Sequence, residues 1–278
     1  QGKVYRLKGY QIPEGGRQAK GIPIINLLDI DPEENITSVI PISEFEEEQY
    51  LFMTTQHGRV KKTPLEEFNT NYTGLIALGL NENDKLIDAK LTTGDQEVIL
   101  GTKDGLAIKF SEKDVRSMGR SARGVKGITL NEKDRVVGMD IVDNNKELLV
   151  ITDKGYGKRT SLDKYRAQKR AGKGIITLKQ NNKNGKVIDI KTVKDEEVIL
   201  ISKEGILLRT SAAEISETGR NTQGVRVMRL NEDDRVASVG YISESEKVDN
   251  SDDNETKDED ESKSKEKSNK DNIEENQE

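Results

Sequence analysis

An internal repeat of about fifty residues dominates the sequence and limits the folds that the chain can adopt. A short apolar run that ends in a tight turn and a glycine recurs as YLFMTTQHG, EVILGTKDG, ELLVITDKG and EVILISKEG, and its glycines are Gly58, Gly105, Gly155 and Gly205. Gly2 opens the chain in the same role, and the intervals between these glycines are 56, 47, 50 and 50 residues. A period of this length is typical of solenoids, arrays and propellers.

The same types of residue recur at fixed distances from these glycines, which we number as position zero of each unit. Position 4 is always basic, and position 10 is always apolar or aromatic. Position 15 is arginine and position 19 is glycine, except in the second unit, where NTNYTGLIALGL is shorter and has no arginine. The chain therefore contains one partial unit, which lacks its opening strand, and four complete units.

Each complete unit is expected to form four short strands. In the last unit EVILIS is rich in β-branched residues, residues 203–205 supply a hairpin turn, and ILLRTS is the return strand. VRVMRL and RVASVGY follow as two more strands, separated by a turn at residues 231–234 that recurs as LNEND and LNEKD. Helical periodicity is hard to find. We therefore predict an all-β, propeller-like fold with four-stranded blades of about 50 residues.

Charge divides the chain into a repeat region and a tail. The formal net charge is −6, but residues 243–278 alone hold 15 acidic and 6 basic residues. Residues 1–242 hold 36 acidic and 39 basic residues, so the repeat region is mildly basic. The tail has almost no apolar residue to bury and is expected to be disordered. We predict one folded domain over residues 1–242 and a disordered acidic tail over residues 243–278.

Residue types that the sequence lacks exclude several classes of protein. The chain has no cysteine, which excludes disulfides and thiolate metal sites and fits a cytoplasmic protein. No run approaches the 18 or so apolar residues of a membrane span, so no membrane partner is expected. The chain begins with Gln1 rather than Met and runs directly into the strand-like KVYRL, without the basic and apolar regions of a signal peptide. We expect it to be a fragment of a longer protein.

The segment after position 10 concentrates basic residues beside glycines. It is VRSMGRSARGVKG in the third unit and YRAQKRAGKG in the fourth, with no acidic residue in either. Arginine side chains and backbone N–H groups next to glycine can both approach a phosphate closely. Equivalent positions of successive blades lie on one rim, so these groups are expected to form a curved basic stripe. The pattern indicates binding to a nucleic-acid backbone rather than to base edges, because recognition helices are absent and aromatic residues are few.

The candidate binding residues are the basic residues of these segments and of position 4, which would extend the stripe. They are Arg6, Arg17, Lys20, Lys62, Lys109, Arg116, Arg120, Arg123, Lys126, Arg159, Arg166, Lys169, Arg170, Lys173, Arg209, Arg220 and Arg226. The alternative is that the arginines are merely solvated on glycine-rich turns. That alternative suits a single turn better than four turns at the same register.

Motifs for catalysis or metal binding are incomplete. YGKRT resembles part of a phosphate-binding loop, but Thr152 replaces its first glycine and Arg159 its hydroxyl residue. DIDPE begins like a calcium loop, but the required glycine is absent and Ile40 stands at the last ligand position. His57 is the only histidine and lies in a hairpin turn, so neither a metal site nor a catalytic triad is expected. No active site and no cofactor are predicted for this chain.

Four motifs resemble the C-terminal domain of the DNA gyrase A protein, namely GRVKKT, SMGRSARGVKGI, GYGKRTSLDKY and EISETGRNTQGVRVMRL. The resemblance covers residues 1–241. It implies a β-pinwheel, a relative of the propeller in which neighbouring blades exchange strands. It also implies a basic outer rim that wraps double-stranded DNA without sequence specificity, with the candidate residues as its DNA contacts.

The resemblance further implies a role in an ATP-dependent type II topoisomerase that introduces negative supercoils at the nucleoid. The partners would be the rest of the gyrase A protein and the gyrase B protein in an A2B2 assembly, which would hold the ATP, the Mg and the catalytic residues. Gyrases carry a Gln-Arg-Arg-Gly-Gly-x-Gly box, and residues 15–21 are only an approximate match to it. Loss of a preceding blade is the simplest expectation for this departure.

Three alternatives stay open at this stage. A topoisomerase IV subunit has an equivalent domain without the box. A protein-binding propeller can be built from similar repeats, but it gives no reason for arginine at position 15. A stand-alone enzyme is the reading with the least support. The acidic tail could in addition compete with DNA for the basic stripe.

Overall fold

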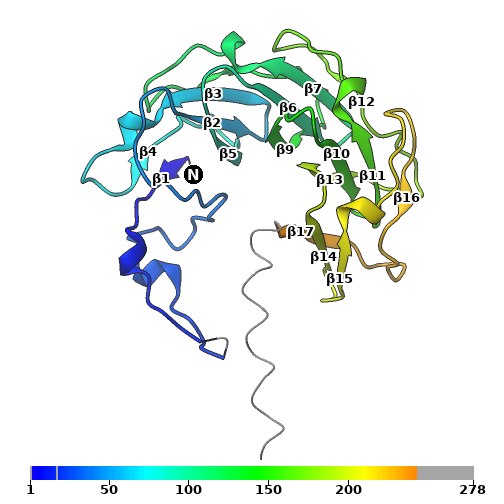
Figure 1. Cartoon of the computed structure of the whole chain (residues 1–278), viewed down its shortest axis with the longest axis horizontal. Coiled ribbons are helices and arrows are strands. Elements are labelled where there is room, and N and C mark those ends of the chain that lie inside the picture. The colour runs from blue at the N-terminus through cyan, green and yellow to red at the C-terminus, as the bar shows by residue number, and fades with distance from the viewer. Residues whose placement is uncertain (1, 17, 243–278) are drawn as a thin grey trace, which may run out of the picture.

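The computed structural model describes residues 2–16 and 18–242. In this part of the chain, short antiparallel sheets follow one another around an open arc (Figure 1). None of the described helices is long and apolar enough to cross a membrane. The tail expected over residues 243–278 and the candidate Arg17 lie outside the described residues.

Three of the sheets have four strands each, in the orders β5-β2-β3-β8, β9-β6-β7-β12 and β13-β10-β11-β16. A further sheet has the order β17-β14-β15, and β1 pairs with β4. The strands are β1 (Lys3–Val4), β2 (Tyr50–Thr55), β3 (Arg59–Pro64), β4 (Leu75–Ile76), β5 (Leu86–Thr92), β6 (Glu97–Thr102), β7 (Leu106–Ser111), β8 (Val125–Lys126), β9 (Val136–Ile141), β10 (Glu147–Thr152), β11 (Tyr156–Ser161), β12 (Ile175–Ile176), β13 (Val187–Val193), β14 (Glu197–Ser202), β15 (Leu207–Ser211), β16 (Val225–Arg226) and β17 (Val236–Ile242).

Helical structure among the described residues is limited to single 3-10 turns, which agrees with the all-β prediction. These turns are η1 (Gly9–Gln11), η2 (Ile24–Asn26), η3 (Leu65–Phe68), η4 (Glu112–Asp114), η5 (Leu162–Lys164) and η6 (Ala212–Glu214). Four of them, η3 to η6, directly follow the second strand of a hairpin. Each turns the chain from the hairpin into the segment that carries the candidate residues.

The outermost strand of each four-stranded sheet comes from the next repeat unit. β8, β12 and β16 pair with β3, β7 and β11 of the preceding unit. The N–H groups of Gly127 and Ile128 extend this pairing, since they donate to the carbonyl of Gly58 at 2.8 and 3.3 Å. The propeller-like fold is thus confirmed, with the strand exchange that the gyrase resemblance implied.

Glycines at two repeat positions make the exchange possible. Gly58, at position zero, has a φ of +77°, and a Cβ on it would lie 2.8 Å from the side chain of Ile128 in the next unit. Gly124, at position 19, has a φ of +70°, and a Cβ on it would lie 2.4 Å from the carbonyl oxygen of Val60. A larger residue would be strained in its backbone and would collide with the neighbouring sheet. Close packing between blades therefore explains these glycines.

The hydrophobic core lies between successive sheets. Val98 and Leu100 of β6 belong to the cluster shared with the preceding blade, whereas Ile99 belongs to the cluster shared with the following one. Because neighbouring residues of a strand point to opposite faces, a strand with both faces covered is apolar throughout. This arrangement explains the continuous apolar runs that mark the repeat.

Candidate nucleic-acid interface

Three loops with a position-15 arginine occupy equivalent places on successive blades. They span residues 115–126, 165–176 and 215–226, and each lies against the second hairpin strand of the preceding unit. Isolated parallel bridges fix this placement, joining Ser117 to Lys62, Ala167 to Lys109 and Glu217 to Arg159. Equivalent backbone hydrogen bonds of 2.8 to 2.9 Å support each bridge. The loops therefore follow one another along the outer edge of the arc.

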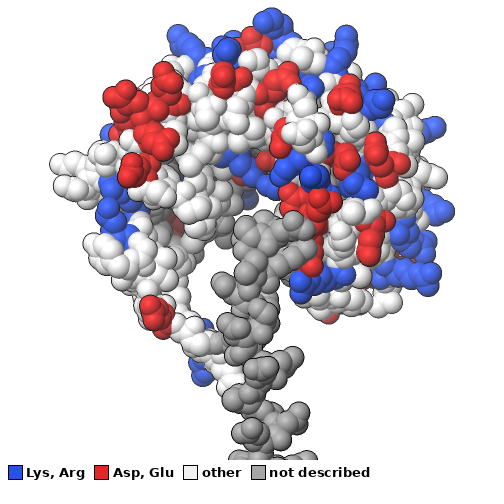
Figure 2. Space-filling model, viewed as in Figure 1, with Lys and Arg blue, Asp and Glu red and all other residues white. Residues whose placement is uncertain are grey.

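Most candidate side chains on these loops are exposed. Figure 2 shows Lys and Arg side chains projecting along the outer edge of the arc, with many Asp and Glu side chains on the face toward the viewer. We call the exposed basic side chains of the three loops, together with Lys20 of the first unit, the basic rim. Its members are Lys20, Arg116, Arg123, Lys126, Arg166, Lys169, Lys173 and Arg226.

Among the described arginines at position 15, Arg120, Arg170 and Arg220 are half-buried, and the last two are hydrogen-bonded to the preceding blade. Arg170 donates from Nε to the carbonyl of Asp114 at 2.9 Å and from Nη1 to the carbonyl of Lys126 at 3.1 Å. Arg220 donates from Nη1 to the carbonyl of Ile176 at 3.1 Å. A guanidinium has five N–H donors, so these contacts leave further donors for a ligand. Arg120 keeps a buried Nη1 that has no hydrogen-bond partner in the described part of the chain.

Position 4 does not extend the rim as expected. Lys62 and Lys109 are only 7% and 8% exposed. The Nζ atom of Lys109 lies 3.5 Å from a carboxylate oxygen of Glu97 on the adjacent strand. The Nζ atom of Lys62 lies 5.0 Å from the centre of the Tyr50 ring. Both ammonium groups also donate to a backbone carbonyl of the next unit, Lys62 to Glu112 at 3.2 Å and Lys109 to Leu162 at 3.4 Å, so these side chains are covered by that unit.

The other basic residues at position 4 have partners within the chain. Arg159 donates from Nη1 to Glu147 at 2.6 Å, and Arg209 is paired with Glu197 although it is more than half exposed. Arg6 lies over the ring of Phe45 at 4.8 Å. The position-4 side chains are therefore engaged within the chain, and we do not count them with the basic rim.

The inner edge of the arc carries charges that neutralise one another. Asp140 of β9 lies 3.5 Å from the Nζ atom of Lys90 and 3.4 Å from that of Lys191, on the two flanking inner strands. Burial acts to raise the pKa of Asp140, but the two ammonium groups and hydrogen bonds from Thr192 lower it below its ordinary value. The inner lysines are thus neutralised locally. The rim loops, in contrast, carry exposed cations at repeated positions.

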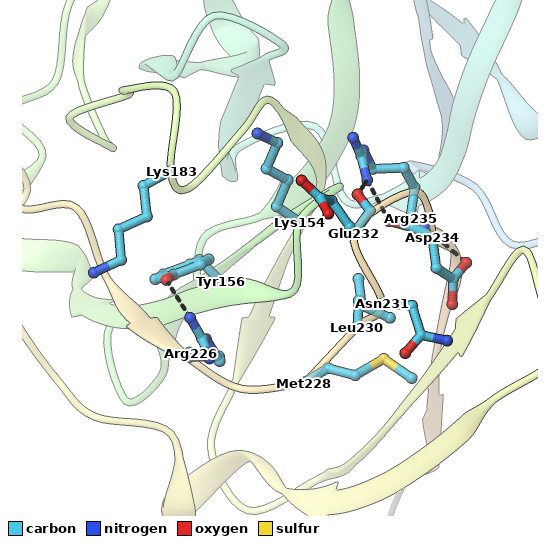
Figure 3. Close-up of a pocket in the computed structure, with 10 residues that line it drawn as sticks. All are labelled: Lys154, Tyr156, Lys183, Arg226, Met228, Leu230, Asn231, Glu232, Asp234 and Arg235. Atoms are coloured by element: carbon cyan, nitrogen blue, oxygen red, sulfur yellow. Dashed lines mark hydrogen bonds between the residues drawn. The ribbon is translucent and has the colours of Figure 1, made fainter.

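A cavity of about 190 Å³ lies between the fourth and fifth units, next to the rim (Figure 3). Four basic side chains contribute to its lining, and one of them, Arg226, donates to the hydroxyl of Tyr156 at 3.3 Å. Its two acidic residues, Glu232 and Asp234, come from the turn before β17. No group of three or more His, Asp or Glu residues in residues 2–16 and 18–242 could hold a metal ion.

Lys61 and Lys158, at position 3, are functional candidates that the sequence reasoning missed. Both are fully buried beneath rim loops, and burial lowers the pKa of each to about 8. Their signal in the sequence is the basic pair in GRVKKT and GYGKRT, since the other units have Tyr, Ile or Leu at this position.

The family model of the DNA gyrase C-terminal domain, described as a β-propeller, matches residues 1–43, 49–93, 96–143, 146–194 and 196–243. The chain belongs to this family. The DNA gyrase A protein of Halalkalibacterium halodurans is 59% identical over 127 residues, which are 45% of this chain and 15% of that protein. The gyrase A protein of Clostridium acetobutylicum is 51% identical over the same length. The match thus spans a small part of these gyrase proteins.

Two solved structures from this group share the fold of the chain. The DNA gyrase A C-terminal domain has a TM-score of 0.76 at 31% identity, covering 87% of this chain and 80% of that one. The C-terminal domain of DNA topoisomerase IV has a TM-score of 0.82 at 27% identity, covering 89% and 79%. The gyrase resemblance seen in the sequence is therefore confirmed, and the shape is common to both kinds of topoisomerase.

Proposed function

We propose that this domain binds double-stranded DNA along the basic rim and wraps it without reading its sequence. The supporting observation is that three equivalent loops place exposed cations at repeated positions along one edge of the arc. Lys and Arg that contact phosphates release condensed counterions, which gives sequence-independent affinity. No described helix is long enough to enter a major groove.

The curvature of the arc supports wrapping rather than a straight contact. Cations on successive loops follow the outer edge of the blades, so a duplex must bend to touch all of them (Figures 1 and 2). Bending a site of 20 to 30 bp by 40 to 90° costs about 1 to 6 kcal/mol. Phosphate contacts on each further loop offset that cost. Arg170 and Arg220 join neighbouring blades and so help to hold the curvature of the rim.

Within a gyrase, this wrapping would support ATP-dependent negative supercoiling by the type II topoisomerase. The partners would be the rest of the gyrase A protein and the gyrase B protein in an A2B2 assembly, located in the cytoplasm at the nucleoid. ATP, Mg and the residues that cleave DNA would belong to those other parts. This domain would need no cofactor of its own.

A salt series on the chain tests the DNA-binding proposal. Eight exposed rim cations, if all of them contact phosphates, give a slope of log affinity against log salt near −7, at about −0.9 per contact. Two 100-bp duplexes of unrelated sequence should bind with the same affinity and the same slope. Absence of binding at low salt, or a preference for one duplex, would contradict the proposal.

A topoisomerase IV subunit is the second candidate, because its C-terminal domain has the higher TM-score of the two solved structures. Joining this domain to a gyrase A core that lacks its own C-terminal domain separates the two. Restored negative supercoiling supports the gyrase assignment. Decatenation without supercoiling supports topoisomerase IV. A protein-binding propeller would instead retain its partner at high salt and after nuclease treatment.

A further inference from the structure

Lys158 lies beneath the turn of the fifth unit's rim loop. It has no exposed surface. Its Nζ atom donates to the carbonyl oxygens of Gly219 and Arg220, both at 2.6 Å, and to the hydroxyl of Thr222 at 3.1 Å. All three acceptors are neutral and belong to one turn. The ammonium group therefore fixes the turn from its inner side and brings a positive charge directly beneath it.

Lys61 has the same place beneath the turn of the third unit. It is also fully buried, and its Nζ atom donates to the carbonyl of Ala77 at 2.6 Å and to the carbonyl of Arg120. Arg120 and Arg220 are both position-15 arginines. Each of these two turns thus rests on a buried ammonium group that is hydrogen-bonded to the backbone of its position-15 arginine.

Other units show that the fold does not require lysine at this position. The third unit has Ile108 there, and the fifth has Leu208. Ile108 lies beneath the turn of the fourth unit, since a Cβ on Gly172 would be 3.3 Å from its Cδ1 atom. An apolar side chain avoids the cost of removing an ammonium group from water. Stability alone therefore does not explain Lys61 and Lys158.

The charges of the turns follow a compensating pattern. The two turns with a buried lysine have glycine at position 14, namely Gly119 and Gly219. The turn above Ile108 has Lys169 at position 14, which is 89% exposed and lies 3.0 Å from a carboxylate oxygen of Asp114. Counted over positions 14 to 17 and the residue beneath them, each of the three turns therefore has one arginine and one lysine, and Arg123 and Lys173 follow at position 18 of two of them. The lysine reaches the turn from inside in two cases and from outside in the third.

The surroundings of both lysines are low in compensating charge. Burial is the main influence on both and lowers each pKa from 10.5 to about 8. Glu67 of η3 acts in the opposite direction on Lys61, and the Arg220 side chain lowers the pKa of Lys158 further. No ion pair joins either lysine to a carboxylate within the described ranges. A phosphate on the outer side of the turn would supply the negative charge that these groups lack.

We propose that Lys61 and Lys158 are positioning residues of the DNA interface, each fixing a rim turn by its carbonyl oxygens and giving it a second positive charge toward a phosphate. This inference rests on the proposed DNA-binding function. A nearby phosphate favours the protonated form of each lysine, so DNA binding is coupled to proton uptake. Affinity should accordingly fall as the pH rises through the range in which the free lysines lose their protons.

The first test measures the affinity for a 100-bp duplex between pH 7 and 9.5 at constant salt. For the unaltered chain we expect the affinity to fall by about tenfold over this range, because both lysines lose the protons that binding requires. The variant with Lys61→Met and Lys158→Met should start about three- to tenfold weaker at pH 7 and change less than about twofold with pH. Matched substitution of Lys133→Met and Lys203→Met, exposed lysines outside the rim loops, should keep the dependence.

The second test does not depend on whether the double Met variant folds. Lysine side chains labelled with ¹³C at Cε are titrated by NMR with and without duplex DNA, and single Met variants assign the two signals. The pKa of Lys61 and of Lys158 should move upward on DNA binding. The inference is overturned, and the proposed function is not, if DNA binds but the pKa values of the two lysines do not change. The same holds if the affinity of the double Met variant depends on pH as strongly as that of the unaltered chain. Absence of binding at every pH contradicts the proposed function as well.

Discussion

The ammonium nitrogen of Lys158 lies 2.6 Å from the backbone carbonyl oxygen of Arg220 in the next repeat unit. One blade thus holds the turn that carries the position-15 arginine of its neighbour, through a charge with no exposed surface. The rim is therefore shaped partly from inside the blades. Under the proposed function, changes in the core should alter DNA binding, and changes at some basic residues should alter stability alone.

The buried lysines should make stability dependent on pH in a defined window. Because burial lowers their pKa from 10.5 to about 8, the folded state binds fewer protons than the unfolded state between these values. The free energy of unfolding should then rise with pH from about 8 toward 10.5 relative to the variant with Met at both positions. Urea denaturation of both proteins at pH 7.5, 9 and 10 checks this. Parallel pH profiles of the two proteins would contradict it.

Glycine at position 19 should be required for the packing of neighbouring blades, and not for the close approach of a phosphate to the backbone. Gly124→Ala places a Cβ 2.4 Å from the Val60 carbonyl at a φ of +70°, whereas a Cβ on Gly219 meets nothing within 4 Å. We expect Gly124→Ala to lower the free energy of unfolding by about 2 to 4 kcal/mol, and Gly219→Ala by less than about 1 kcal/mol. Chemical denaturation measures both. Equal effects would show that the contact between blades is not tight.

Replacing Lys109 should lower the stability of the fold and leave DNA binding unchanged. Lys109→Met removes the pair with Glu97, which is 35% exposed and can regain water. The free energy of unfolding should fall by about 1 to 3 kcal/mol. The salt slope of DNA binding should be unchanged, because an ammonium group in this packed place reaches no phosphate. A smaller slope in the folded variant would return Lys109 to the interface.

Exposed rim cations should carry the salt dependence. Replacing Arg116, Arg123, Arg166 and Lys173 by Gln should reduce the magnitude of the salt slope by about 3 to 4 and weaken binding to all sequences alike. The matched control replaces four exposed lysines outside the rim loops, Lys133, Lys179, Lys194 and Lys203, by Gln. A slope that falls equally in the control would mean that affinity follows total charge and not the rim.

The repeat predicts much of this architecture from the sequence, because glycine turns and apolar runs are local signals. The exchange of strands is not local: Val125–Lys126 is two residues long, and its pairing with Arg59 and Val60 depends on the neighbouring unit. The resemblance to gyrase, and not the residue pattern, implied that exchange.

The site was less predictable, because position 4 is basic whether or not its side chain is exposed. A signal for its pairing within the chain was present in three units. Glu97, Glu147 and Glu197 stand across the hairpin from position 4, where a diagonal pair forms. The lysines at position 3 have no carboxylate partner that the sequence could reveal, since their acceptors are backbone carbonyls.

The topology of closed circular DNA tests the central claim of wrapping along the rim most directly. A nicked circle is saturated with the chain, sealed with ligase and freed of protein, and its linking number is compared with that of a circle sealed alone. Wrapping predicts a shift of one consistent sign that grows with bound protein and is lost in the variant with the four rim cations replaced by Gln. An unchanged linking number at full saturation would contradict the account.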